Sequence, residues 1–287
     1  MLDRTAGVLT VPGVAISTCA TATSEDVTTS LRRYINSGME LRIMPLGASI
    51  TAGVDSTDGN GYRLDLQHKL EGDGNNVTYV GTRFHGNMSD NACEAYSGYT
   101  IEAIDNATMA SGALDFMPNI ILLNAGTNDC NKKGMDPAGA PMRYATLLSH
   151  IKAKCPDALV VDSSLLPNLD PTVNSCIVTL NEGLRKVSRD ARANGQKTHF
   201  VEMYDVVPTD DINTKDKTHP NDAGYRLMAQ AWFEAIQNSS SKIDAPVQGA
   251  RKPLDSPGPT GGAIGFGAPA TIFVVVLTGV LAVILAV

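Results

Sequence analysis

Short apolar runs alternate with amphipathic stretches along the middle of the chain. Five runs are predicted as strands because they are short and rich in apolar residues; they cover residues 41–46, 77–80, 119–124, 158–162 and 198–203. Four stretches carry apolar residues at helical spacing, over residues 61–70, 144–153, 173–192 and 222–236. The last of these follows Asn221, a residue type that caps helix N-termini.

This alternation predicts an α/β protein with one domain over residues 39–240. A parallel sheet covered by helices on both faces is the simplest arrangement of such elements. In a sheet of this kind, functional groups gather at the carboxyl ends of the strands. The residues that directly follow each predicted strand are therefore the place to look for chemistry.

The N-terminal end differs from this middle part. A short apolar stretch over residues 6–17 follows Arg4, and residues 20–22 have the sequence Ala-Thr-Ala, which matches the small-residue form of a signal-peptidase site. The pattern predicts a signal peptide over residues 1–22. The alternative is an N-terminal segment that is merely mildly apolar.

The C-terminal end carries a stronger signal. Prolines and glycines mark a linker over residues 241–268, and no charged residue follows Asp255. Residues 269–287 form an apolar tail that fits either a GPI-attachment signal or a spanning helix of marginal length. We therefore expect a secreted protein that is tethered to the cell surface through this tail.

Composition narrows the possible partners and the compartment. The net charge of −7 and the pI near 5.2 disfavour nucleic acid, because no basic surface is available for phosphates. Cleavage after residue 22 would remove Cys19 and leave an even number of cysteines, which allows two disulfides with the pairing open; they are Cys93, Cys130, Cys155 and Cys176. Four N-glycosylation sequons agree with secretion, at Asn76, Asn87, Asn106 and Asn238.

Four short segments lie at or near the predicted carboxyl edge of the sheet. They cover residues 47–51, 96–100, 126–129 and 216–220. The first contains Ser49, the second Gly98 and the third Asn128, while the fourth contains Asp216 and His219. Each segment alone is also explained by a turn or a helix cap. Their combination in this order is what points to catalysis.

The residue types in these segments suit nucleophilic catalysis. A serine hydroxyl such as that of Ser49 needs a base to remove its proton. His219 can supply this base, and a carboxylate three residues earlier, Asp216, can bind the second ring nitrogen and fix the tautomer. The side-chain amide of Asn128 and the backbone N–H groups of Gly98 and Ser49 can form an oxyanion hole.

With these four segments the chain resembles the SGNH (GDSL-type) hydrolases, whose motif blocks occur in the same order between about residues 41 and 236. The resemblance implies a three-layer α/β/α sandwich of flavodoxin type with a five-stranded parallel sheet. It also implies that Ser49 is the nucleophile, that Asp216 and His219 complete the triad, and that Ser49, Gly98 and Asn128 form the oxyanion hole. The segments around Ser49, Gly98 and His219 are most similar to the acetylxylan esterases of carbohydrate esterase family 3 and their fungal relatives.

The expected reaction is hydrolysis of short acyl esters, chiefly acetyl, on a polysaccharide such as xylan. No cofactor is expected, because ester hydrolysis by a serine, a histidine and an aspartate needs none. No metal is expected either, because no two histidines have the spacing of metal ligands. A lipid-type esterase, lysophospholipase or thioesterase with the same triad is the alternative enzyme. A non-catalytic surface binding protein is the alternative from another class. Acyl length, the alcohol part of the substrate and the oligomeric state stay open.

One position departs from the family pattern, because Ala48 stands where the family usually has Asp before the nucleophile. Loss of this carboxylate predicts looser positioning of Ser49, with activity retained. Asp129 is expected to anchor its loop through hydrogen bonds rather than to act as an acid. Tyr96 and Tyr99 flank Gly98, where they either line an acyl or sugar site or serve in packing.

Overall fold

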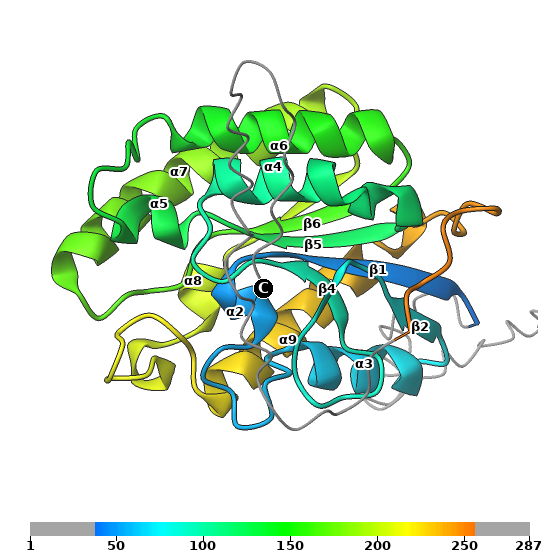
Figure 1. Ribbon diagram of the computed structural model, residues 1–287, viewed down its shortest axis with the longest axis horizontal. Helices are drawn as coiled ribbons and strands as arrows, with labels where there is room; N and C mark the ends of the chain where they lie inside the picture. Colours follow the sequence, from blue (N-terminus) through cyan, green and yellow to red (C-terminus); the bar gives the residue numbers. More distant parts are fainter. Residues whose placement is uncertain (1–37, 256–287) are drawn as a thin grey trace, which may run out of the picture.

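The computed structural model describes residues 38–255 (Figure 1). The predicted signal peptide, Cys19, the apolar tail and the last part of the predicted linker lie outside the described residues. Within residues 38–255, no helix combines the length and the apolar character that crossing a membrane requires.

One sheet organises the described part of the chain. It has seven strands, in the order β3-β4-β1-β5-β6-β7, with β2 also paired to β1. All pairings are parallel except that between β3 and β4. The strand bounds are β1 Glu40–Gly47, β2 Asn76–Tyr79, β3 Arg83–Phe84, β4 Ala92–Ala95, β5 Ile120–Asn124, β6 Leu159–Ser163 and β7 Thr198–Val201.

Helices cover both faces of this sheet. Figure 1 shows α4, α6 and α7 on one side of the strands and α3 and α9 on the other. The shorter helices α2, α5 and α8 lie at the edge where the central strands end. The helix bounds are α2 Ser49–Ala52, α3 Arg63–Gly72, α4 Ile101–Ser111, α5 Thr127–Asn131, α6 Ala140–Lys154, α7 Pro171–Ala193, α8 Met203–Val206 and α9 Asp222–Asn238.

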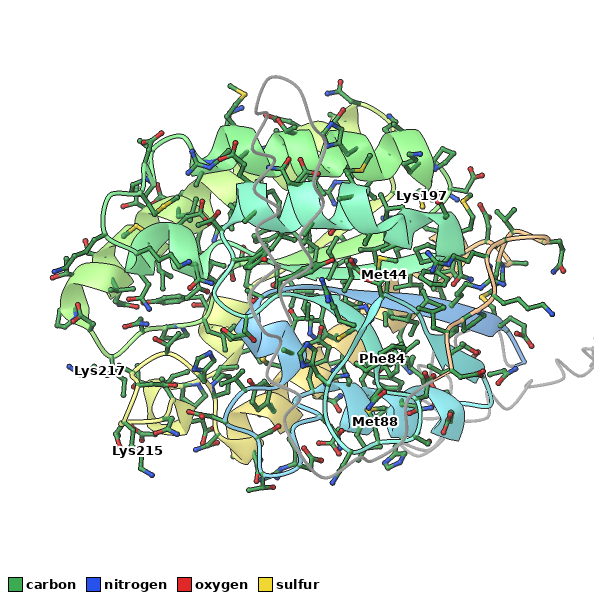
Figure 2. The ribbon with its side chains drawn as sticks, in the orientation of Figure 1. Met44, Phe84, Met88, Lys197, Lys215 and Lys217 are labelled. Atoms are coloured by element: carbon green, nitrogen blue, oxygen red, sulfur yellow. A yellow bond between two sulfur atoms is a disulfide. The ribbon has the colours of Figure 1, made fainter. Side chains whose placement is uncertain are left out.

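Alternate residues of the central strands enter two separate apolar layers. In β1, Ile43 faces α3 and α9, whereas its neighbour Met44 joins the layer beneath α4, α6 and α7. Met44 and Met88, both labelled in Figure 2, belong to these opposite layers. Because the central strands are buried on both faces, apolar residues stand at adjacent positions in them, as in Ile43-Met44 of β1, and not only at every second position. The largest buried side chain is Trp232 of α9, which packs against Tyr62.

The three-layer α/β/α fold expected from the sequence is confirmed. All five predicted strands and all four predicted helices occur near the expected bounds, and Asn221 caps α9 by accepting hydrogen bonds from Ala223 N and Gly224 N at 2.8 and 3.0 Å. The sheet contains two more strands than predicted, β3 and β4. Both are short: β3 has two residues, and β4 places Glu94 in a strand of four buried residues. Helix α4 was not predicted either.

The chain beyond α9 stays in contact with the domain. Ile243 is buried, and the carbonyl oxygen of Asp244 accepts a hydrogen bond from Asn119 Nδ2 at 2.8 Å. Further on, the guanidinium of Arg251 lies 4.5 Å from the ring centroid of Phe116. The described part of the predicted linker therefore lies along the edge where the strands begin.

A buried carboxyl group lies within the sheet on the side of α7. Asp162 of β6 is fully buried and accepts hydrogen bonds from Ser188 Oγ at 2.9 Å and from Tyr144 OH at 3.4 Å. Burial raises the pKa of Asp162 from 3.8 to about 7, and these hydrogen bonds offset only part of the effect. Ionisation of this side chain is therefore less favourable in the folded protein than in the unfolded chain.

This group gives the stability of the fold a defined pH dependence. Between pH 3.8 and about 7 the unfolded chain loses this proton before the folded chain does, so the contribution of Asp162 to the free energy of unfolding falls as pH rises. Asp162→Asn removes the titration and keeps the shape. Relative to wild type, the variant is expected to gain stability on going from pH 5 to pH 8, by roughly 1–4 kcal/mol.

Urea unfolding at the two pH values measures the effect, with exposed Asp157→Asn as the control. If the free energies of unfolding of Asp162→Asn and wild type differ by the same amount at both pH values, the raised pKa of Asp162 is contradicted.

Candidate active site

The first part of the site is the turn between β1 and α2. Gly47 ends β1 and Ser49 begins α2, so the serine side chain projects from the carboxyl edge of the sheet. A Cβ atom at Gly47 would lie 2.2 Å from Thr51 Oγ1 and 2.3 Å from Asn124 O, so only glycine fits there. The chain can therefore turn directly from the strand into the helix that carries Ser49.

The segment with Gly98 follows the neighbouring strand. Ala95, the last residue of β4, pairs with Gly47, and Tyr96 N donates a hydrogen bond to Gly47 O at 3.0 Å. Gly98 has a φ of +82°, and a Cβ atom there would meet open space. The backbone conformation, rather than lack of room, is thus what favours glycine at this position.

Asn128 reaches the same edge from the other side of β1. Asn124, the last residue of β5, also pairs with Gly47, and α5 begins three residues later. The side-chain Nδ2 of Asn128 donates a hydrogen bond to Tyr99 O at 2.9 Å. This bond uses one amide hydrogen and fixes the orientation of the group, so that its second hydrogen stays available to a ligand.

Asp129 anchors this loop, as predicted from the sequence. Its side chain is fully buried; Oδ2 accepts a hydrogen bond from Ile101 N at 2.9 Å, and Oδ1 pairs with Arg143 at 3.1 Å. The carboxylate thereby joins the start of α4 to α5 and α6. With both oxygens occupied, Asp129 has a structural role and does not act on a substrate.

The histidine and its carboxylate come from the loop before α9. His219 Nε2 lies 2.7 Å from Ser49 Oγ, and His219 Nδ1 lies 2.5 Å from Asp216 Oδ2. With Nδ1–H donating to the carboxylate, Nε2 is free to accept the serine proton. The loop is held by a hydrogen bond from Asn213 N to His219 O at 2.8 Å, and its exposed lysines, Lys215 and Lys217, lie at its outer edge (Figure 2).

The environment keeps Asp216 ionised. Partial burial alone would raise the pKa of this carboxyl group. Hydrogen bonds from the His219 side chain and from the backbone N–H groups of Thr218 and His219 outweigh burial and lower the pKa to about 2. At any pH well above 2, a negative charge therefore stands next to the imidazole.

A second carboxylate that the sequence did not reveal lies beside the first. Asp55 is held by Asn213 Nδ2 at 2.8 Å and has a φ of +69°, which is uncommon for a residue with a side chain. Burial and the neighbouring charge of Asp216 raise the pKa of Asp55. Asp55 follows Ser49 by six residues without any recognisable motif, so no sequence signal could have found it.

Asp55, Asp216 and His219 could together hold a cation. One possible ligand atom from each of the three lies within 4.8 Å of the others. The spacing of the histidines in the sequence predicts no metal site. Because His219 Nδ1 is already bonded to Asp216, a metal at this position would compete with the hydrogen bond that orients the imidazole.

The arrangement of Ser49 and His219 does not depend on a carboxylate at position 48. Ala48 is 8% exposed, and its methyl group belongs to the apolar layer on the side of α4, α6 and α7. Despite the absence of the family's usual Asp, Ser49 Oγ remains within hydrogen-bond distance of His219 Nε2. The looser positioning of Ser49 expected from the sequence stays a prediction.

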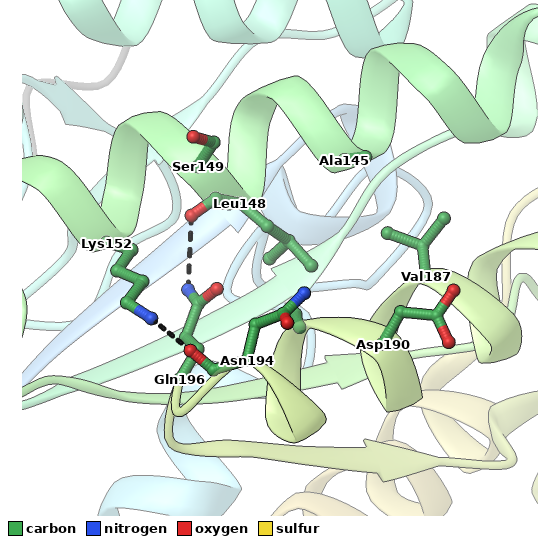
Figure 3. A pocket seen from close by; sticks show the side chains of 9 residues that line it. Ala145, Leu148, Ser149, Lys152, Val187, Asp190, Asn194 and Gln196 are labelled. Carbon is green, nitrogen blue, oxygen red and sulfur yellow. Dashed lines mark hydrogen bonds between the residues drawn. The ribbon is translucent and has the colours of Figure 1, made fainter.

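A separate cavity of about 250 Å³ lies between α6 and α7, away from these residues (Figure 3). Lys152 Nζ donates to Asn194 O at 2.6 Å and Gln196 Nε2 donates to Leu148 O at 3.1 Å along its border. Its lining includes no residue of the four segments singled out above. The cavity therefore belongs to the packing of the two helices and not to this site.

Comparison with known proteins identifies the family. The GDSL-like lipase/acylhydrolase family matches residues 46–227, which include Ser49, Gly98, Asn128, Asp216 and His219. The chain belongs to this family.

Individual relatives of this GDSL-like hydrolase agree with the assignment. A multidomain esterase of Ruminococcus flavefaciens is 29% identical over 247 residues; the match covers 76% of the chain and 31% of the relative, so the chain spans about a third of that protein. A family 3 carbohydrate esterase of Clostridium thermocellum is similar in structure, with a TM-score of 0.60 and 22% identity over 70% of this chain and 98% of the other.

A family 3 carbohydrate esterase of Talaromyces cellulolyticus shares the fold to the same degree, with a TM-score of 0.60 and 19% identity over 71% of this chain and all of the other. At these identities the two likenesses establish the fold alone. They confirm the SGNH hydrolase fold that the motif order implied.

One disulfide stabilises the loop region of this GDSL-like hydrolase. Cys130 of α5 is bonded to Cys176 of α7, whereas Cys93 and Cys155 are buried free thiols. The cysteine count allowed two disulfides, and one is present among the described residues. The bond lies two residues after Asn128, so it ties the short helix with this side chain to the long helix α7.

Removal of this bond is expected to lower the stability of the fold. The two cysteines are separated by 46 residues, and closing a loop of this order stabilises a protein by roughly 2–4 kcal/mol. The Cys130→Ala/Cys176→Ala variant should therefore melt about 5–15 °C below wild type.

Thermal unfolding followed by circular dichroism measures the loss. Wild type treated with a reductant is the matched control and should approach the melting temperature of the variant, which itself should not respond to the reductant. An equal response of both proteins would contradict the assignment.

Proposed function

We propose that this chain hydrolyses short-chain esters, chiefly acetyl esters on a polysaccharide such as xylan, with Ser49 as the nucleophile. The observation that supports this most strongly is the hydrogen-bonded series Ser49 Oγ, His219 Nε2, His219 Nδ1 and Asp216 Oδ2, with distances of 2.7 and 2.5 Å. A serine, a base and an orienting carboxylate in this order are what acyl transfer requires.

The first half of the reaction forms an acyl-enzyme. His219 Nε2 takes the proton of Ser49 as Oγ attacks the ester carbonyl carbon, and Asp216 stabilises the resulting imidazolium. The carbonyl oxygen becomes negatively charged and is bound by Ser49 N, Gly98 N and Asn128 Nδ2. Each such donor typically lowers the barrier by about 2.7–4 kcal/mol. The alcohol then leaves with the proton from His219.

The second half releases the acid. His219 takes a proton from a water molecule, which attacks the acyl carbon in the same oxyanion hole. Collapse of the tetrahedral intermediate breaks the bond to Ser49 Oγ, and the serine regains its proton from His219. The cycle consumes one water molecule and needs no cofactor.

The choice of an acetylated polysaccharide rests on two lines of support. The segments around Ser49, Gly98 and His219 resemble the acetylxylan-esterase branch. Two proteins with similar structures are named family 3 carbohydrate esterases. The same triad would also serve a lipid-type esterase or a thioesterase, so a test must compare acyl lengths and alcohol parts.

Replacement of the nucleophile tests the reaction. Ser49→Ala in the full chain should lower kcat on p-nitrophenyl acetate by roughly 10⁴-fold or more, because the acyl-enzyme cannot form. Wild type should release more acid from acetate than from butyrate or octanoate esters and should deacetylate acetylated xylan. Initial rates of acid release measure all four substrates.

Ser175→Ala, an exposed serine of α7, is the matched control and should retain wild-type rates. A preference for octanoate would replace the carbohydrate proposal with the lipid one. Turnover of acetate that persists in folded Ser49→Ala would contradict the role of Ser49.

We further propose that the chain is secreted and held at the cell surface. The Cys130–Cys176 disulfide supports this, because such bonds persist in oxidising compartments. The asparagines of all four sequons are exposed, so each is accessible to a glycosyltransferase.

Expression of the full chain in a eukaryotic secretory host tests the proposal. The protein is expected on the cell surface, with a mass that falls on treatment with an N-glycosidase. Accumulation of unglycosylated protein inside the cell with Cys130 and Cys176 reduced would contradict it.

A further inference from the structure

Two stacked tyrosines lie beside the site. The ring centroids of Tyr96 and Tyr99 are 5.2 Å apart and their planes differ by 15°. Tyr96 is 6% exposed, whereas Tyr99 is 42% exposed. The stack therefore presents one flat aromatic ring to solvent, although aromatic residues make up only 5% of the chain.

The inner ring of this stack is immobilised. The hydroxyl of Tyr96 donates to the fully buried carboxylate of Glu94. Glu94 also accepts hydrogen bonds from Thr82 N at 2.7 Å and from Ser111 Oγ at 2.8 Å. The guanidinium of Arg83 lies 4.8 Å from the centroid of the Tyr96 ring. A ring bound in this way is a rigid support for the exposed one.

The backbone of Tyr99 joins the stack to the reacting centre. Tyr99 N donates to Tyr96 O at 3.0 Å, and Tyr99 O accepts the hydrogen bond from Asn128 Nδ2 at 2.9 Å. Tyr99 also directly follows Gly98. Tyr99, which carries the exposed ring, is thus bonded to Asn128 through its carbonyl oxygen and follows Gly98 in the chain. Asn128 and Gly98 are two of the three proposed oxyanion donors.

We propose that the exposed ring of Tyr99 is a platform on which the sugar ring bearing the ester stacks. This inference rests on the proposed esterase function and extends it to the alcohol part of the substrate. A pyranose ring has faces of C–H groups and a rim of hydroxyl groups. An aromatic ring can cover one such face while the rim stays in contact with water and with polar groups, as at other half-exposed tyrosines.

A long acyl chain is a poorer match for this surface. Apolar ligands of that kind bind in concave sites that enclose most of their area. The ring of Tyr99, in contrast, is 42% exposed and packs against the ring of Tyr96, so it does not enclose a ligand. The Tyr99 ring is therefore assigned to recognition of the alcohol part of the ester and not of the acid part.

Esters with and without a sugar ring distinguish sugar binding by Tyr99 from a general effect on catalysis. In the full chain, Tyr99→Ala should raise KM for an acetylated xylo-oligosaccharide by about 5- to 10-fold, the size expected for loss of one stacking contact. The value of kcat/KM for ethyl acetate, which has no ring, should stay within about twofold. The reason is that the variant retains the backbone carbonyl oxygen of residue 99, which accepts the hydrogen bond from Asn128. Acid release in a pH-stat measures hydrolysis of both esters.

Two further substitutions at this position sharpen the test. Tyr99→Phe keeps the ring and should restore binding of the sugar ester, whereas Tyr99→Leu keeps an apolar side chain without a flat face and should not. Met109→Ala, at an exposed apolar residue late in α4, is the matched control and should behave as wild type on both esters.

Equal losses of Tyr99→Ala on both esters, or no loss on either, would overturn the inference. A direct binding measurement tests the role of Tyr99 in sugar binding independently of catalysis. Ligand-observed NMR with xylotetraose and the Ser49→Ala chain should show contact that disappears in the Ser49→Ala/Tyr99→Ala chain. Absence of Ser49-dependent hydrolysis in wild type would instead contradict the proposed function, while the NMR comparison would still decide the role of Tyr99.

Discussion

The close approach of three strand ends at Gly47 is the constraint on which the site depends. Gly47 pairs with Ala95 on one side and with Asn124 on the other, and no side chain fits at this position. Parallel strands bring their carboxyl ends to one edge, so the segments that follow all three emerge together. Ser49, Gly98 and Asn128 are widely separated in the sequence and become neighbours because they lie just after these ends.

A buried charge fixes the loops that surround this edge. The guanidinium of Arg63 is fully buried and donates hydrogen bonds to four carbonyl oxygens at 2.8–3.1 Å, those of Ala52, Gly59, His85 and Asn91. A buried charge is tolerated only where such bonds replace water. The same side chain thereby joins Ala52, the last residue of the helix that begins with Ser49, to the segment between β3 and β4. The loops at this edge are thus held together partly by a residue outside every motif.

Much of this arrangement could be predicted from the sequence. Continuous apolar runs identify β1, β5 and β6, because strands buried on both faces leave a strong local signal. The residues after the strands then follow from topology. Strand β4 could not be found in this way, since its buried Glu94 is stabilised by Thr82 and Ser111, which are distant in the sequence. The roles of Asp55 and Arg63 could not be predicted for the same reason, because they arise from tertiary contacts that no local sequence pattern encodes.

Position 48 shows which parts of the site are determined by side chains and which by the backbone. In place of the family's usual Asp, the buried Ala48 packs in an apolar layer. Ser49 is nevertheless fixed by hydrogen bonds of the backbone, from Ala52 N to Ala48 O at 3.0 Å and from Val54 N to Ser49 O at 3.0 Å. The histidine loop is fixed independently by Asn213 N bonding to His219 O. Because each partner is held by its own backbone contacts, their separation of 2.7 Å does not require a carboxylate at position 48.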